Sequence, residues 1–166
     1  MTEAEFRSLY TQYRDPLFRF GYRLTGSAET AEDLVHDCFA GLFRDGFDAR
    51  RASMKTYLYA AMRNLCRKRY RDSGREELLD ENADPPVSAG VIEALISRET
   101  AVAVQRAVAS LPLLQREALV LFEYEELRLD EISKVVEADL AAVKSRLHRA
   151  REALRKALAP LMRETA

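Results

Sequence analysis

The side chains best suited to chemistry in this chain are cationic, and they are concentrated in two runs, NLCRKRYR at 64–71 and VKSRLHRAR at 143–151. Arginine and lysine bind phosphates and the acceptor edge of guanine, while serine and histidine can contact several groups on DNA. Tyr57 and Tyr59 precede the first run and Tyr70 lies within it, and aromatic rings can stack on unpaired bases. Each run could also be an ordinary solvated basic helix with its tyrosines in the core. The chemistry indicated is noncovalent recognition of nucleic acid.

A third run, AEDLVHDCF at 31–39, is acidic around an apolar stripe. Asp33 and Asp37 lie one helical turn apart with only His36 nearby, and no second acidic helix offers a matching set of ligands. A protein-contact face is therefore favoured over a metal site. The sequence also lacks a nucleophile elbow and a glycine-rich phosphate loop. We predict no catalytic constellation, no metal and no cofactor, and we do not expect an enzyme.

The formal net charge is only −1, yet charge is sorted along the chain. Residues 41–75 hold ten lysines and arginines against three acids, a net charge of +7, and residues 144–166 hold seven against two, a net charge of +5. The other segments are acidic, with net charges of −3 at 1–40, −6 at 76–99 and −4 at 100–143. This asymmetry indicates anionic partners better than the net charge does.

These runs must be positioned by helices, because helical periodicity extends through most of the chain. Thr2 and Glu5 have the spacing of a capping box, which predicts a first helix that ends at Gly26. Ser27 and Ser53 are placed to cap two further helices. We expect these three helices to close a small bundle near residue 72.

The segment 73–90, SGREELLDENADPPVSAG, has little periodicity and two prolines, so it predicts a linker. Residues 91–110 follow as a predicted helix, and Pro112 suits the first turn of the next one. A short helix, DEISKVV, with Asp130 as a possible cap, is separated by EAD from a long basic helix opened by Asp139.

No strand pattern is found, so we predict an all-α fold of two small helical domains joined by a flexible acidic linker. The short helix, tight turn and longer basic helix have the layout of a helix-turn-helix, in which the second helix enters the major groove. Cys38 and Cys66 form no CxxC or Cys/His cluster, which predicts buried structural thiols. No apolar run approaches the length of a membrane span, and a cytoplasmic protein without membrane insertion is expected.

The order of these runs carries a resemblance. The segments AEDLVHDCF, TYLYAAMRNL, LPLLQREALVLFEYEELRLDEISKVV and VKSRLHRAREAL resemble the extracytoplasmic-function (ECF) group of the sigma-70 family of bacterial RNA polymerase sigma factors. The resemblance covers nearly the whole chain outside the linker. It implies a region 2 helical bundle at 1–72, a linker at 73–92 and a region 4 helix-turn-helix at 93–166.

The resemblance also implies partners and an activity. The partners would be core RNA polymerase, contacted at its β′ clamp helices and β flap, promoter DNA, and an anti-sigma factor that holds the protein inactive. The activity would be recognition of the −35 and −10 promoter elements and strand opening to initiate transcription. Polymerase, rather than this chain, would supply the catalysis.

Individual roles follow from the resemblance only. The implied polymerase-binding residues are Asp33, Leu34, His36, Asp37 and Phe39. The implied −10 contacts are Arg50, Arg51, Ser53 and Lys55, in a loop that captures a flipped base, and Arg63, Asn64, Arg67 and Lys68. The implied −35 contacts are Lys144, Ser145, Arg146, His148 and Arg149, with Arg146 and Arg151 as phosphate contacts or supports.

The chain departs from the family pattern at two kinds of position. His36 and Asp37 stand where the family usually has Gln-Glu. Glu126 and Glu137 stand where the family often has glycine, which adopts positive φ at low cost. We therefore expect the turn to be built differently, with Ala138 or Asp139 adapting, and we expect Glu137 to place a negative charge near the DNA side.

Three other functions remain open from sequence. A stand-alone helix-turn-helix transcription regulator would need neither the acidic run at 31–39 nor the basic run at 64–71. A nucleic-acid enzyme would need a metal-binding carboxylate cluster. A purely structural helical protein would bind neither polymerase nor DNA.

Overall fold

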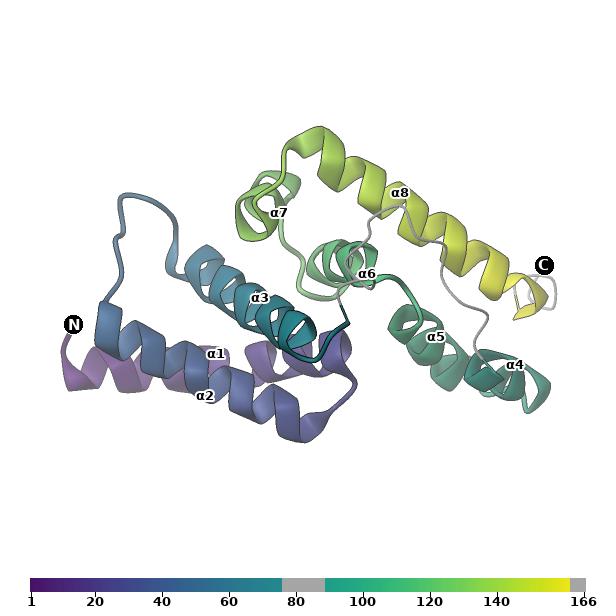
Figure 1. Ribbon diagram of the computed structural model, residues 1–166, viewed down its shortest axis with the longest axis horizontal. Helices are drawn as coiled ribbons and strands as arrows, with labels where there is room; N and C mark the ends of the chain where they lie inside the picture. The colour runs from purple at the N-terminus through teal and green to yellow at the C-terminus, as the bar shows by residue number, and fades with distance from the viewer. Residues whose placement is uncertain (76–88, 162–166) are drawn as a thin grey trace.

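The protein is helical throughout the described residues, 1–75 and 89–161, of the computed structural model, and no strand occurs among them (Figure 1). The prediction of an all-α fold is confirmed. The helices are α1 (Glu3–Thr25), α2 (Ala28–Asp45), α3 (Met54–Asp72), α4 (Ala89–Ile96), α5 (Thr100–Ala109), α6 (Leu113–Leu119), the π-helical η2 (Val120–Tyr124), α7 (Leu129–Val136) and α8 (Leu140–Ala157).

The first three helices begin at the predicted caps. Glu5 donates its backbone N–H to Thr2 Oγ1 over 3.1 Å, and Thr2 donates its own to Glu5 Oε2 over 2.9 Å, which completes the capping box. Ser27 and Ser53 each accept the N–H three residues on, at 3.1 Å. Gly26 ends α1 with φ of 73°. These local signals fix where α1, α2 and α3 start.

The three helices pack around an apolar core that includes Leu17, Phe20, Leu34, Leu42, Leu58 and Met62. The closest approach is at Gly21 of α1, where an added Cβ would lie 3.0 Å from Met62 Cε and 3.3 Å from Ala31 Cβ. Such a Cβ would push apart the faces of α1, α2 and α3. Glycine therefore lets these helices pack closely at this level.

The second half departs from the predictions in three places. The single helix expected at 91–110 is two helices, because Arg98 adopts a φ of 60° between α4 and α5. Helix α4 begins at Ala89, inside the predicted linker at 73–92, and the rest of that prediction at 76–88 lies outside the described residues. Asp130 is not the cap of α7, which begins at Leu129 after Arg128.

The predicted turn chemistry was also wrong. Glu126 and Glu137 themselves adopt left-handed conformations, with φ of 56° and 52°, so the turns keep the geometry that glycine would have supplied. Asp139 is extended and caps α8, accepting the Ala142 N–H at 2.8 Å. Two glutamates therefore carry a conformational cost of about 1–2 kcal/mol each.

The two halves of the chain pack directly against each other. Helix α3 lies between the α1–α2 pair and the helices α6 and α7, while α8 lies on the far side of α6 and α7 (Figure 1). The C-terminal end of α1 contacts α5, α6 and η2. One continuous apolar cluster includes residues of both halves. The second half thus covers part of the face of α3 that is turned away from its own bundle.

Candidate nucleic-acid interface

Helix α8 presents a polar face that the fold leaves open. Its apolar stripe of Val143, Leu147 and Ala150 is buried and packs against α6 and α7. Between these positions Lys144, Ser145, His148 and Arg149 are exposed, and Arg146 is half-buried. Four of the five residues predicted to read DNA from this helix therefore share an accessible surface, with α7 preceding them in a helix-turn-helix arrangement.

The −10 candidates divide into exposed and covered groups. In the loop before α3, Arg50 and Arg51 are exposed and lie 3.2 Å and 3.7 Å from the Asp48 carboxylate. Ser53 serves as the α3 cap, and Lys55 is half-buried. On α3 itself, Asn64 and Lys68 are exposed, but Arg67 is half-buried and Arg63 is buried. The structure does not place the whole predicted set on one open surface.

Arg63 of α3 points into the second half of the chain. Its side chain is 2% exposed and that of Glu117 on α6 is 1% exposed. Arg63 Nε donates to both carboxylate oxygens of Glu117 at 3.2 Å, and Nη2 lies 3.1 Å from Oε1. Burial raises the pKa of Glu117, and Arg63 opposes that rise. The two-point geometry makes this a buried ion pair.

Further polar contacts cross the same interface. Arg116 of α6 donates across it to the Leu24 carbonyl at the end of α1, and within its own half it donates to the Leu111 carbonyl over 2.7 Å. Tyr59 donates its hydroxyl to Glu125 Oε2 over 2.7 Å. Burial and the hydrogen bond to Glu125 raise the pKa of Tyr59. The interface is therefore built from specific buried hydrogen bonds as well as apolar packing.

These interface residues were missed by the sequence reasoning. A signal was present, since Gln115, Arg116 and Glu117 interrupt the otherwise apolar run from Leu111 to Leu121. Every residue of that run is buried. Charged residues are almost never fully buried unless they are paired, so an acid and a base inside such a run indicate partners elsewhere in the fold.

The acidic run on α2 also separates into surface and core. Asp33, His36 and Asp37 are exposed, and Arg69 of α3 lies 3.6 Å from Asp33. Leu34 and Phe39 are 1% and 3% exposed and belong to the core of the first three helices. Direct contact with a partner is therefore open to the three polar residues, whereas Leu34 and Phe39 hold α2 in place beneath them.

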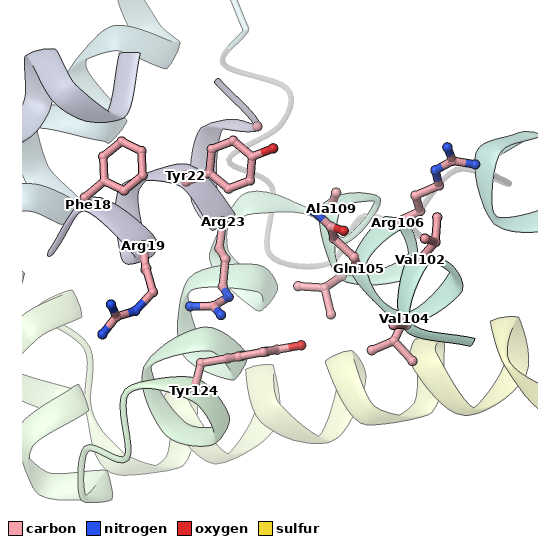
Figure 2. A pocket seen from close by; sticks show the side chains of 13 residues that line it. Phe18, Arg19, Tyr22, Arg23, Val102, Val104, Gln105, Arg106, Ala109 and Tyr124 are labelled. Carbon is pink, nitrogen blue, oxygen red and sulfur yellow. The ribbon is translucent and has the colours of Figure 1, made fainter. Parts of the chain in front are cut away.

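A groove lies between the two halves. Its walls come from α1, through Phe18, Arg19 and Tyr22, and from α5 and η2, with Tyr124 facing Arg23 across it (Figure 2). The Arg23 guanidinium lies 4.2 Å from the Tyr124 ring centroid and 3.7 Å from Glu125. The groove thus exists only while the two halves are together.

Cysteines and possible metal ligands were surveyed over the described residues. Within it, no group of three His, Cys, Asp or Glu side chains is placed to hold a metal ion. Cys38 and Cys66 are buried, and burial raises the pKa of each thiol to about 12. Across the described residues, no helix has the length and apolar character needed to span a membrane.

Comparison with known proteins identifies the class. Residues 9–76 match the family Sigma-70 region 2, and residues 101–154 match the family Sigma-70, region 4. The chain belongs to the sigma-70 family of RNA polymerase sigma factors, within its ECF group. A match to region 2 over the first three helices does not favour a stand-alone helix-turn-helix regulator.

Two ECF sigma factors and one solved structure are similar to this chain over most of its length. The chain is 31% identical over 169 residues to ECF RNA polymerase sigma factor SigW of Bacillus subtilis, covering 94% of this chain and 90% of that protein. It is 33% identical over 162 residues to ECF RNA polymerase sigma factor SigE of Mycolicibacterium smegmatis, covering 95% of this chain and 63% of that protein. The fold is similar to that of the sigma factor RpoE from Bartonella quintana, solved in complex with the anti-sigma factor NepR, with a TM-score of 0.71, 24% identity, and coverage of 93% and 97% of the two chains.

Proposed function

We propose that this sigma factor docks on core RNA polymerase through the exposed acids of α2, reads the −35 element with α8, and reads and opens the −10 element with α3 and the loop before it. The observation that carries the proposal is the α8 surface. Lys144, Ser145, His148 and Arg149 stand exposed beside a buried apolar stripe. Such a helix can enter a major groove without disturbing its own packing.

The first half supplies the contacts to single-stranded DNA in this proposal. Arg50 and Arg51 are exposed in the loop, where guanidinium groups can hold phosphates around an extruded base. Extrusion costs a few kcal/mol of lost stacking, which contacts in a pocket must offset. Asn64 and Lys68 extend this surface along α3. Strand opening needs no covalent step, so the proposed role is that of a non-catalytic initiation factor.

The division of the chain follows the same proposal. Region 2 comprises 1–72, the linker 73–92 and region 4 93–166, although α4 already begins at Ala89. An anti-sigma factor is proposed as a further partner, supported by the complex of the structurally similar RpoE with NepR. We place the protein in the cytoplasm, because core polymerase and promoters are there.

Reconstitution tests the proposal. The chain is mixed with core polymerase, and run-off transcripts are sequenced from a genomic library. We expect a defined set of products that share one −35 and one −10 sequence. Absence of promoter-dependent products, together with no co-purification of core enzyme, would overturn the assignment.

A pair of variants tests the docking surface separately. Asp37→Arg reverses an exposed charge in the middle of α2, and we expect it to abolish co-purification with core polymerase. Glu29→Arg makes the same change at an exposed position in the first turn of α2 and should leave binding intact. Equal binding by both variants would show that polymerase uses another surface.

A further inference from the structure

The loop between α2 and α3 is held at both of its ends. At its start, the Phe47 ring packs edge-on against Tyr57 of α3, with 5.4 Å between the ring centroids. At its end, Ser53 accepts the Thr56 N–H over 3.1 Å and donates its hydroxyl to Thr56 Oγ1 over 3.0 Å. The segment 48–52 is thus fixed on either side, and its own contacts decide how its cations are presented.

Asp48 makes most of those contacts. Its Oδ1 accepts the Arg50 backbone N–H over 3.0 Å and Arg50 Nε over 3.2 Å, and its Oδ2 lies 3.7 Å from Arg51 Nε. Its backbone carbonyl accepts the Arg51 N–H over 3.2 Å. A carboxylate that accepts the N–H two residues on forms an Asx turn, which orders the backbone locally. One residue therefore shapes the turn and gathers both guanidinium groups.

The same carboxylate lowers the charge that the loop presents. Arg50 and Arg51 together with Asp48 carry a net charge of +1 instead of +2. The side chains of Arg50 and Arg51 are 91% and 88% exposed, and that of Asp48 is 39% exposed. Exposed ion pairs are weak because water screens them, so these two exchange readily. A phosphate offers a guanidinium the same two-oxygen acceptor as a carboxylate, so DNA can take the place of Asp48.

We propose that Asp48 is the positioning residue of the −10 loop: its hydrogen bond to the Arg50 N–H orders the turn, and its charge holds Arg50 and Arg51 until DNA phosphate replaces it. The inference rests on the proposed function, because that function assigns the loop to the −10 strand. Asp48 acts through the two arginines and not by touching a base. It orders the loop and lowers its affinity for phosphate, so the loop favours DNA with the correct extruded base over DNA in general.

Binding of the holoenzyme to a forked promoter DNA tests both roles. The promoter sequence is taken from the run-off products of the unmodified chain, and its −10 non-template strand is left unpaired. Affinity is measured by fluorescence anisotropy at several KCl concentrations, for the preferred −10 sequence and for a fork with the −10 bases replaced. The ratio of the two affinities reports selectivity, and the slope of log affinity against log salt reports phosphate contacts.

Asp48→Asn separates the two roles, because asparagine keeps a side-chain oxygen for the Arg50 N–H and loses the charge. We expect about threefold tighter binding, in line with the weakness of exposed ion pairs, and unchanged selectivity. The salt slope should steepen by about 0.7, the contribution of one further phosphate contact on a single strand. Asp48→Ala removes the oxygen as well, and it should lower selectivity about fivefold because the hydrogen bond that orders the turn is lost.

Asp45→Asn is the matched control. Asp45 lies at the end of α2 and its carboxylate is 3.2 Å from Arg44 Nε, so this variant makes the same charge change beside a different arginine. It should alter affinity and slope by less than Asp48→Asn and leave selectivity as it is. Circular dichroism should show the same helix content for all three variants, because neither aspartate belongs to the apolar core.

The outcomes separate the inference from the proposed function. Asp48→Asn that binds no tighter than Asp45→Asn overturns the inference, and so does Asp48→Ala with full selectivity. Either result leaves the proposed function standing when the unmodified holoenzyme binds the preferred fork selectively. Should the unmodified chain direct no promoter-dependent transcription with core polymerase, the proposed function fails and the inference with it.

Discussion

Helices α3 and α8 are similar in length, at 19 and 18 residues, and each carries six lysines and arginines. Their cations nevertheless have different surroundings. On α8 the polar face is open to solvent, whereas on α3 the other half of the chain covers Arg63 and half-buries Arg67. Similar composition therefore gives one helix an exposed cationic face and the other a cationic face that is partly covered. The difference lies in the packing partner rather than in the helix.

The largest expected effect concerns Arg116, which joins α6 to the end of α1 beside the contact that covers Arg63. Arg116→Met keeps much of the side-chain volume but leaves the Leu24 and Leu111 carbonyls without their guanidinium donor. The Leu24 carbonyl keeps the Tyr70 hydroxyl as a donor, whereas the Leu111 carbonyl loses its side-chain donor. We expect a loss of about 2–4 kcal/mol in the free energy of unfolding, measured by urea titration, because a hydrogen bond from a charged group contributes about 1.5–3 kcal/mol and an unsatisfied buried acceptor costs about 1–3 kcal/mol. Arg106→Met, at an exposed arginine of α5, should cost far less. Equal losses would show that Arg116 contributes little to the interface.

A substitution on the exposed face of α8 should change DNA binding and leave stability nearly unchanged. Arg149→Ala is expected to lose about 1–3 kcal/mol of discrimination between the preferred −35 sequence and single-base variants, with little change in unfolding free energy. Competition binding of the holoenzyme to duplexes measures this. Arg155→Ala, an exposed arginine two turns further along α8, provides the control. A preference that survives in Arg149→Ala would mean that α8 docks differently.

The buried thiols of Cys38 and Cys66 predict that the free energy of unfolding depends on pH. Helix α8 has no cysteine and makes no such contribution. Burial raises the pKa of Cys66 on α3 from 9.0 to about 12, so the native thiol holds its proton more tightly than the unfolded one. Stability must then fall as pH rises above the unfolded value, by about 1.4 kcal/mol per thiol at pH 10.

Cys66→Ala should reduce the loss of stability between pH 8 and pH 10 by that amount in urea titrations. Cys38→Ala should do the same, because burial raises the pKa of Cys38 equally, to about 12. An undiminished loss in both variants would assign the pH dependence to other groups.

The smallest effect is expected at the turn that orients α8. Glu137→Gly removes a left-handed glutamate, and it should raise the free energy of unfolding by about 0.5–1 kcal/mol after the greater chain entropy of glycine is subtracted. Lys134→Gly, at an exposed position within α7, should have the opposite sign, at about 1 kcal/mol. In thermal melts, the melting temperature should therefore rise for Glu137→Gly and fall for Lys134→Gly. A lower melting temperature for Glu137→Gly would mean that its side chain stabilises the turn.

The parts of the fold that sequence predicted are those encoded by neighbouring residues. Caps at Thr2, Ser27, Ser53 and Asp139 involve a side chain and an N–H three residues on, so their spacing is visible in the sequence. The break between α4 and α5 was missed because it uses Arg98 at positive φ, with no glycine or proline to mark it. Asp130 was predicted as the cap of α7 but lies in its first turn. The helix dipole favours an acid at either place, so the sequence does not distinguish them.

For the candidate site, local sequence patterns predicted which side chains of α8 are buried and which are exposed. The apolar stripe of α8 indicated which residues would be buried, and the exposed set follows by difference. On α3 that reasoning did not indicate that Arg63 is buried, because it is covered by Glu117, which lies 54 positions away in the chain. The charged residues within 111–121 indicate buried partners, but no local pattern shows that Arg63 is one of them. Leu34 and Phe39 were placed on the polymerase surface by resemblance, although their apolar spacing on α2 already marked them as core.

Arg116 reaches a carbonyl 92 positions earlier in the chain, and this span has a consequence for biosynthesis. The ribosome makes α1, α2 and α3 before α6 exists. At about 5–20 residues per second, the end of α1 waits roughly 5–20 s for its donor. During that time the Tyr70 hydroxyl of α3 is the donor to the Leu24 carbonyl, and Arg63 remains uncovered. Every newly made molecule therefore passes through a stage in which its first three helices are complete and Glu117, the partner of Arg63, has not yet been translated.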